Sequence, residues 1–339
     1  LGGKYISYTE EKPITMNPFK ISRSEYNIEK VDFLKNLILL IWKGSDAKIP
    51  EIEFRIVEQI IIDYYDAYFN GFSGYTDEQR EVLLKNLFAS ASRKNTNMAP
   101  KDVDDMVRKQ IDVLEKRRAA LKVTELSFNS FFDYSFGRLE QICTENDITT
   151  ISYSTYSTML QPFYKGGAYE KILNENVDST LFDETFIVFE VDAIKENKKL
   201  FPIVTLIIMD VFLQKMRLKK NRKVLVIEEA WKAIASPLMA EYIKYLYKTA
   251  RKFWASVGVV TQEIQDIIGS EIVKEAIINN SDVVMLLDQS KFKERFDEIK
   301  KILGLTDVDC KKIFTINRLE NKDGRSFFRE VFIRRGANG

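Results

Sequence analysis

The sequence predicts an α/β protein in which a mainly parallel sheet is combined with an all-helical lobe. Between Val31 and Lys122, apolar residues recur every three or four positions, which is typical of amphipathic helices. After residue 180 the pattern changes to short β-rich runs that alternate with amphipathic segments. Continuous apolar strands separated by helices are typical of a parallel sheet that is covered on both faces.

Three start signals in the helical half predict where its helices begin. Thr76 precedes two acidic residues, Ser127 opens an aromatic-rich segment, and Pro100 stands just before the segment around Val103. Ser and Thr side chains cap the free N–H groups of a first helical turn, and proline is favoured at the first helical position. We therefore expect helices to begin at these three positions, with a loop at residues 70–74.

Short apolar runs after residue 180 predict strands, and the longer segments between them predict helices. The predicted strands are Phe186–Val191, Val224–Ile227, Ser256–Thr261 and Val283–Leu287, and the predicted helices are 198–219, 236–252, 271–279 and 291–301. Lys4–Thr9 is alternating and β-rich, which predicts one further strand. Near the C-terminal end, Lys312–Arg335 alternates around Asp323 and Gly324, which predicts a hairpin with a tight turn.

The composition excludes several kinds of chemistry. Among 339 residues there is no histidine, which rules out His-containing catalytic triads, imidazole acid–base catalysis and His-containing metal sites. The two cysteines, Cys143 and Cys310, are too few for a disulfide scaffold. With 51 Lys and Arg against 50 Asp and Glu, the formal charge is +1, so a polyanionic partner would need a local basic patch.

The two longest apolar runs, Phe33–Trp42 and Leu200–Leu213, are too short for a membrane-spanning helix and contain Lys35 and Asp210. We therefore expect no transmembrane segment in this chain. Because the first residue is Leu1 and no leader segment follows it, we also expect the chain to be a fragment.

The most informative local pattern is the string KVLVIEEAW at Lys223–Trp231. Its apolar residues place Glu228 and Glu229 at the carboxyl end of a predicted strand, where open α/β sheets bind ligands. One carboxylate directed toward a hydrated Mg²⁺ and a second toward an attacking water would suit nucleotide hydrolysis. Two acids at the start of a helix would account for the same residues, because they favour the positive end of the helix dipole.

Two further residues favour the hydrolytic interpretation. Gln262 follows the next predicted strand, where its amide would orient a water or contact a γ-phosphate. Arg251 lies eleven residues earlier and would reach the phosphate of a neighbouring subunit. Each residue also has a simpler explanation, since Gln262 could start a helix and Arg251 could neutralise the dipole at a helix end.

Together these features resemble the TraG-type ATPases of conjugative transposons, which are related to the conjugation ATPases of type IV secretion systems in the RecA-like HerA/FtsK group. The resemblance covers essentially the whole chain. Its markers are the segment 2–19 and the strings EEAW at 228–231, ARK at 250–252, VTQ at 260–262 and INNS at 278–281. The resemblance implies a RecA-like P-loop NTPase core with an inserted all-helical lobe. It assigns residues 1–24 and 181–339 to the core and residues 25–180 to the helical lobe.

The resemblance also implies the cofactors ATP and Mg²⁺ and a role for each residue of the site. Glu228 takes the Walker B position on the metal side, Glu229 the catalytic carboxylate, Gln262 the sensor amide and Arg251 the arginine finger. The wider family usually has aspartate at the position of Glu228. The glutamate side chain is one methylene longer, so both direct and water-mediated contact with Mg²⁺ stay open. In the predicted hairpin, Arg325 could also approach the nucleotide, although a tight turn explains the neighbouring glycine without any ligand.

A phosphate-binding loop with the pattern G-x-x-x-x-G-K-[ST] is missing from the sequence. Neither Gly3-Lys4-Tyr5 nor Lys165-Gly166-Gly167 fits it. In the resembled family this loop lies upstream of a segment like Leu1–Phe19. We therefore expect the intact protein, meaning this chain together with that upstream loop, to hydrolyse ATP, and the 339-residue chain alone to be inactive.

The resemblance implies that the intact protein energises type IV secretion and conjugation of DNA at the cytoplasmic face of the inner membrane of a bacterium. The implied partners are the nucleotide, other type IV secretion components, and a DNA substrate or relaxase complex. An arginine that acts in trans in a closed ring implies a homo-hexamer. A DNA-translocating coupling or motor ATPase and a non-catalytic interaction module of the same machinery are the alternatives.

A run of basic residues immediately precedes the EEAW strand. Its members are Lys215, Arg217, Lys219, Lys220, Arg222 and Lys223. Such a run could contact DNA phosphates or an acidic lipid surface. We favour the interpretation as a helix C-terminus, because cations there interact favourably with the helix dipole.

Overall fold

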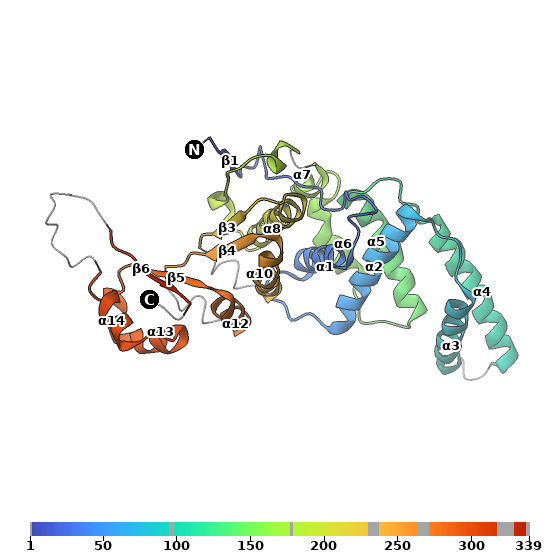
Figure 1. The fold of residues 1–339 in the computed structure, drawn as a ribbon. Helices are drawn as coiled ribbons and strands as arrows, with labels where there is room; N and C mark the ends of the chain where they lie inside the picture. Colours follow the sequence, from blue (N-terminus) through green and yellow to red (C-terminus); the bar gives the residue numbers. More distant parts are fainter. Residues whose placement is uncertain are drawn as a thin grey trace. The chain divides into compact units, whose positions relative to one another are not determined.

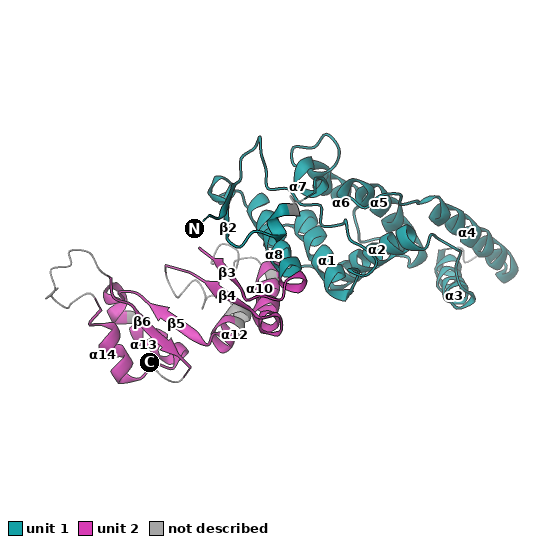
Figure 2. Cartoon of the chain, turned by 45° about the horizontal axis from the view of Figure 1, so that its top comes forward, with its two compact units in different colours: residues 1–215 teal, residues 216–339 magenta. Residues whose placement is uncertain are grey.

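The computed structural model describes residues 2–94, 98–176, 179–229, 237–262, 271–316 and 329–336. The chain divides into two compact units, Leu1–Lys215 (unit 1) and Met216–Gly339 (unit 2) (Figure 2). The lobe boundaries expected at residues 24 and 180 stay predictions.

Unit 1 is built mainly from helices (Figure 1). They are α1 (Ile28–Lys43), α2 (Glu51–Phe69), α3 (Asp77–Lys94), α4 (Pro100–Ala120), α5 (Phe128–Glu145), α6 (Tyr153–Leu160), α7 (Glu170–Asn174) and α8 (Leu200–Leu218), with short 3₁₀ turns at Gln161–Phe163, Ser179–Phe182 and Asp192–Ile194. The three predicted start signals are confirmed. The Gln79 N–H donates to Thr76 Oγ1 at 3.2 Å, Ser127 forms a capping box, and Pro100 is the first residue of α4.

Aromatic side chains form the centre of unit 1. Phe19 is fully buried and stacks on Phe131 with ring centroids 5.0 Å apart, while Tyr64 meets Phe131 edge-on at 5.4 Å. The α3–α4 pair has an apolar cluster of its own. The predicted helical periodicity is therefore used for core packing, as expected for an amphipathic bundle.

A parallel strand pair flanks the helical segment in the sequence. β1 (Lys4–Ser7) pairs in parallel with β2 (Ile187–Glu190), with Lys4 opposite Ile187. Helices α1 to α7 all lie between these two strands in the chain. The strand predicted at the N-terminal end is confirmed, and the helices form an insertion between two neighbouring strands.

A buried ion pair fixes α8 against α1. Lys30 Nζ donates to Asp210 Oδ2 at 2.7 Å, and both side chains are less than a tenth exposed. The pair therefore joins the first and the last helix of unit 1.

Unit 2 contains a second parallel strand pair and an antiparallel pair. Its elements are β3 (Lys223–Ile227), α10 (Pro237–Thr249), a 3₁₀ turn at Ala250–Phe253, β4 (Ala255–Val259), α12 (Glu271–Asn280), β5 (Val283–Leu286), a 3₁₀ turn at Ser290–Arg295, α13 (Phe296–Leu303), α14 (Asp307–Ile313) and β6 (Phe332–Arg335). β3 and β4 run parallel, and β5 and β6 run antiparallel. The described strands therefore form three two-stranded sheets, two of them parallel, in a chain that is mostly helical.

The C-terminal segment differs from the predicted hairpin. Lys312 lies in α14, which begins at a capping box between Thr306 and Asp309. β6 pairs with β5 rather than with a strand around Lys312. The capping box and the buried side chain of Ile313 account for the helix, since they stabilise its first turn and pack its apolar face. The predicted turn at Asp323-Gly324 lies outside the described residues.

In the parts of the chain that the structure describes, no helix combines the length and the apolar character needed to cross a bilayer.

Candidate functional site

The carboxyl ends of β3 and β4 lie next to each other. Ile227 is opposite Val259 in the register, and the Val260 N–H donates to the Ile227 carbonyl at 2.9 Å. Glu228 directly follows the first of these strand ends, and Gln262 follows the second after two residues. The prediction that both would lie at adjacent strand ends is therefore borne out by the backbone.

The backbone of Glu229 adopts a left-handed conformation with φ of +46°. Among the described residues, Asp147 and Trp254 are the other non-glycine residues with positive φ. Such conformations are uncommon outside glycine and cost of order 1–3 kcal/mol, and they cluster at functional sites. The chain therefore turns sharply just after β3, at the residue that the sequence marks as the catalytic carboxylate.

The polar side chains at this edge are accessible to a ligand. Glu228 and Gln262 are exposed, and Glu229 is half-buried. The described ranges hold no group of three or more His, Cys, Asp or Glu side chains that could enclose a metal ion. Mg²⁺ at a nucleotide site keeps several waters and is bound by one or two carboxylates plus phosphates, so an exposed carboxylate such as Glu228 fits that role.

Arg251 lies at the opposite end of the parallel pair. It belongs to the 3₁₀ turn at Ala250–Phe253, immediately before β4, whereas Gln262 follows the far end of that strand. Five strand residues span about 16 Å, so the Arg251 backbone is separated from the Glu228 edge by roughly that distance. The structure brings the two glutamates and Gln262 to one edge, and it does not bring Arg251 to them within one chain.

Arg325, the second residue expected to contact the nucleotide, lies outside the described residues, as does Trp231 of the EEAW string.

Several members of the basic run make hydrogen bonds within the protein. Lys215 Nζ donates to the carbonyls of Leu181 and Glu184, Lys223 Nζ to the Phe253 carbonyl at 3.0 Å, and Arg217 Nη2 to Tyr245 Oη at 3.3 Å. These bonds tie the end of α8 and the start of β3 to their surroundings. Lys215 and Arg217 lie near the end of α8, as the favoured interpretation as a helix C-terminus expects, whereas Lys223 is the first residue of β3.

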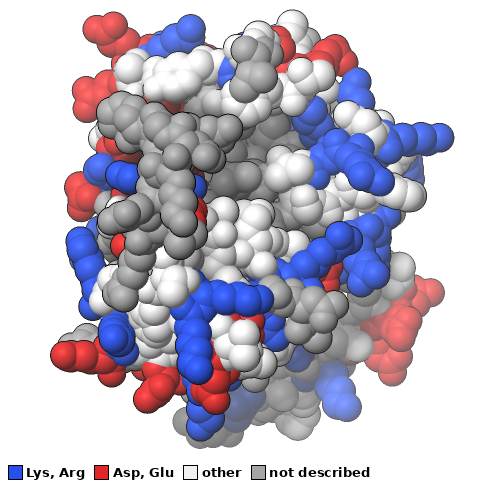
Figure 3. All heavy atoms as spheres, turned by 60° about the vertical axis from the view of Figure 1, so that its left-hand side comes forward, with Lys and Arg blue, Asp and Glu red and all other residues white. Residues whose placement is uncertain are grey.

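The near-zero net charge conceals a difference between the two units. Unit 1 has 27 Lys and Arg against 33 Asp and Glu, and unit 2 has 24 against 17, which gives net charges of −6 and +7. Figure 3 shows many Lys and Arg side chains on the face drawn. Unit 2 therefore has the basic character that the composition of the whole chain did not indicate.

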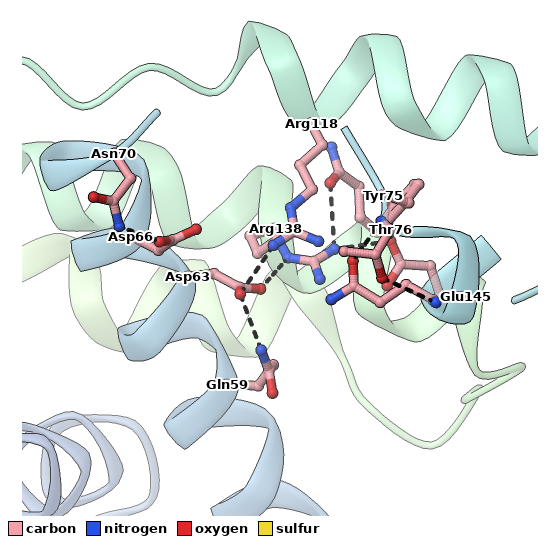
Figure 4. A network of polar contacts seen from close by, with 11 residues as sticks. Gln59, Asp63, Asp66, Asn70, Tyr75, Thr76, Arg118, Arg138 and Glu145 are labelled. Carbon is pink, nitrogen blue, oxygen red and sulfur yellow. Dashed lines mark hydrogen bonds and ion pairs between the residues drawn. The ribbon is translucent and has the colours of Figure 1, made fainter. Parts of the chain in front are cut away.

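Unit 1 contains a buried network of charged side chains that the sequence patterns did not predict (Figure 4). Asp63 on α2 accepts hydrogen bonds from Arg138 Nε at 2.6 Å and from Arg118 Nη2 at 3.0 Å. Arg138 Nη1 donates to Glu145 at 2.9 Å, and the Tyr75 hydroxyl donates to the same carboxylate at 2.6 Å. Burial alone would lower the pKa of Arg138, but Asp63 and Glu145 outweigh it and hold that pKa above its usual value.

This network connects four parts of the helical unit and lies beside an open cavity of about 360 Å³. One available signal was Asp63 itself, a charged residue between the apolar Ile60-Ile61 and Tyr64-Tyr65 of α2. Its donors and acceptors are matched within the protein, which favours a structural role.

Comparisons with known proteins indicate the family and the fold of the chain. The profile of a family described as the TraG P-loop domain matches residues 1–79 and 67–339. The chain is 30% identical over 116 residues to the type IV secretion system protein CagE of Helicobacter pylori, a match that covers 33% of this chain and 12% of that protein. Among solved structures, VirB4 of Thermoanaerobacter pseudethanolicus has a similar fold, with a TM-score of 0.54 at 17% identity, over 92% of this chain and 71% of that one.

Proposed function

Because this chain belongs to the TraG P-loop domain family, we propose that it is part of an ATPase that energises type IV secretion during conjugative transfer of DNA. The observation that carries the proposal is the adjacency of the β3 and β4 carboxyl ends, which brings Glu228 and Glu229 to the edge where Gln262 follows. Open α/β sheets bind ligands at this edge, and phosphoryl transfer uses residues there that bind the metal and orient the attacking water. The similarity to a type IV secretion protein supports the biological setting.

Each residue of the site then has one task. Glu229 accepts a proton from the attacking water, and Gln262 orients that water. Glu228 would hold Mg²⁺, which when bound neutralises charge on the phosphates. The left-handed backbone of Glu229 supports this assignment, because it turns the chain at the carboxyl end of β3, where the attacking water would bind.

Arg251 completes the site from a neighbouring subunit. Its position before β4, at the other end of the strand from Gln262, supports a contact with the next subunit's nucleotide rather than its own. A head-to-tail contact of this kind closes into a ring, which we take to be a hexamer at the cytoplasmic face of the inner membrane. The other secretion components, with DNA or a relaxase complex as cargo, are its proposed partners.

We expect the purified 339-residue chain to show no Mg²⁺-dependent ATP turnover, because the sequence contains no phosphate-binding loop. Phosphate release at saturating ATP is the measurement, with the Glu229→Gln chain as the blank. Turnover by the wild-type chain that the Glu229→Gln chain lacks would contradict this expectation.

We expect mixtures of two inactive variants of the intact protein to recover activity. An Arg251→Ala subunit keeps its own Glu229, and a Glu229→Gln subunit supplies Arg251 to its neighbour. If the sites act independently, a random equal mixture regains about a quarter of the wild-type turnover. Lys252→Ala, which removes the adjacent exposed cation, is the matched control and should stay active alone. A mixture as inactive as its components would show that Arg251 does not act in trans.

A DNA-translocating motor is the second candidate, and the net charge of +7 on unit 2 favours it. Turnover of the intact protein measured with and without single- or double-stranded DNA distinguishes the two. Strong stimulation by DNA supports a motor, and indifference to DNA together with co-purification of channel components supports the secretion ATPase.

A further inference from the structure

Trp254 has an unusual backbone conformation for a large side chain. It follows the 3₁₀ turn at Ala250–Phe253 with a left-handed backbone, at φ of +56° and ψ of +35°. Glycine or asparagine usually occupies such a position, because a Cβ atom makes the conformation unfavourable. Burial does not offset this cost, since 67% of Trp254 is exposed. A strained and exposed aromatic residue indicates that its side chain contacts another molecule.

Trp254 lies at the amino ends of the parallel strands, beside the start of β3. The Lys223 N–H donates to the Trp254 carbonyl at 3.1 Å, and Lys223 Nζ donates to the Phe253 carbonyl at 3.0 Å. Lys223 is opposite Ala255 in the register, so Arg222 and Trp254, one residue earlier in each segment, are neighbours. The segments that precede β3 and β4 therefore meet at this edge.

Both of these segments are basic and contain no acidic residue. Residues 211–227 hold six Lys or Arg, residues 242–262 hold four, and neither range contains Asp or Glu. The exposed cations directly before the two strands are Lys220, Arg222, Arg251 and Lys252. A helix dipole does not account for Lys220 and Arg222, because α8 ends at Leu218. Cations gathered without acidic neighbours in sequence favour an anionic partner.

The combination of one exposed ring with several cations fits single-stranded nucleic acid. Phosphates bind Lys and Arg, and an unpaired base can stack on an aromatic ring. In a duplex the bases are already stacked, so a duplex would use the cations alone. An anionic membrane also attracts cations, but its binding increases with buried apolar area, and the large apolar side chains exposed here are Leu218 and Trp254.

We propose that Lys220, Arg222, Lys252 and Trp254, which we call the amino-edge patch, bind single-stranded nucleic acid. An unpaired base stacks on Trp254, and the three cations contact phosphates. The patch lies at the opposite end of the β3–β4 pair from Glu228, about 16 Å away along the strands. It is therefore separate from the proposed ATP site, and its test requires no ATP hydrolysis.

The first test measures the Kd of the 339-residue chain for a fluorescein-labelled thymidine oligonucleotide by fluorescence anisotropy. We expect Trp254→Asn to raise this Kd about tenfold, because it removes the stacking ring. Asparagine tolerates the left-handed backbone, so the Tm of the variant should equal or exceed that of the wild type. Trp254→Phe keeps an aromatic ring and should stay within about threefold of the wild-type Kd.

The second test removes two cations of the patch. We expect the double variant Arg222→Ala/Lys252→Ala to raise the Kd about tenfold at low salt and to reduce the slope of log K against log salt by about 1.4, or 0.7 for each lost contact. The matched control is Lys301→Ala/Lys311→Ala, which removes two exposed cations of the same unit from α13 and α14. Its Kd should stay within about twofold of the wild type.

Three results would overturn the proposal. They are a wild-type chain that does not bind the oligonucleotide, a Trp254→Asn chain with unchanged Kd, and equal weakening by the two double variants. Co-sedimentation with phosphatidylglycerol vesicles tests the membrane. Loss of vesicle binding in Trp254→Asn, with unchanged oligonucleotide binding, would assign the patch to lipid instead. Absence of ATP turnover in the intact protein would reject the proposed function and leave these binding results unaffected.

Discussion

The Glu229→Gln substitution in the intact protein is expected to lower kcat for ATP hydrolysis by about 100- to 10,000-fold, the range for loss of a general base. The amide has nearly the same shape as the carboxylate, but it cannot accept the proton of the attacking water. ATP binding should change little, because the substitution leaves Glu228 and the phosphate contacts in place. Phosphate release and equilibrium binding of a fluorescent ATP analogue measure the two quantities.

Glu241→Gln is the matched control for this experiment. Glu241 lies on α10 in the same unit, exposed and paired with Lys244 at 3.3 Å. The Glu241→Gln substitution removes one negative charge and leaves the strand ends unchanged, so kcat should stay within about twofold of the wild type. Equal activity of the Glu229→Gln and wild-type proteins would remove the catalytic carboxylate from the proposal.

The Asp63→Ala substitution is expected to lower the free energy of unfolding of the 339-residue chain by about 3–5 kcal/mol. Asp63 is the shared acceptor of Arg138 and Arg118, whose side chains are 4% and 12% exposed. Without it, buried positive charge is left uncompensated, and that loss exceeds the value of the ion pair itself. Urea unfolding followed by circular dichroism, with hydrogen exchange to locate the change in unit 1, measures the effect.

Asp66→Ala controls for loss of an acid on the same helix. Asp66 lies one turn from Asp63, is exposed, and accepts a hydrogen bond from Asn70. We expect its removal to cost less than about 1 kcal/mol. Similar effects of the two substitutions would show that the network contributes no more than a surface interaction.

Features encoded within a few residues could be predicted from the sequence. Val224–Ile227 is a continuous apolar run that ends at two charges, so both the strand and the position of Glu228 at its end could be inferred. Ser127 and Pro100 are start signals whose effect is local, and both begin helices as expected. The place of Gln262 followed from the strand before it, because parallel strands end at the same edge.

Features that depend on tertiary packing could not be predicted. Asp63 and Arg138 are 75 positions apart, so their pairing depends on how helices pack. At the C-terminal end, the alternating pattern after Lys312 predicted a strand. The sequence also has Thr306 and Asp309 at the spacing of a capping box, which begins α14 in the structure. The charge of unit 2 was hidden because the opposite charge of unit 1 cancels it.

A cryo-EM structure of the intact protein with Mg²⁺ and a non-hydrolysable ATP analogue tests the central claim most directly. We expect the γ-phosphate at the carboxyl ends of β3 and β4, with Glu228 on the metal side, Glu229 and Gln262 around the attacking water, and Arg251 entering from the neighbouring subunit. A nucleotide bound away from the β3–β4 edge, with Glu229 and Gln262 remote from its γ-phosphate, would contradict it.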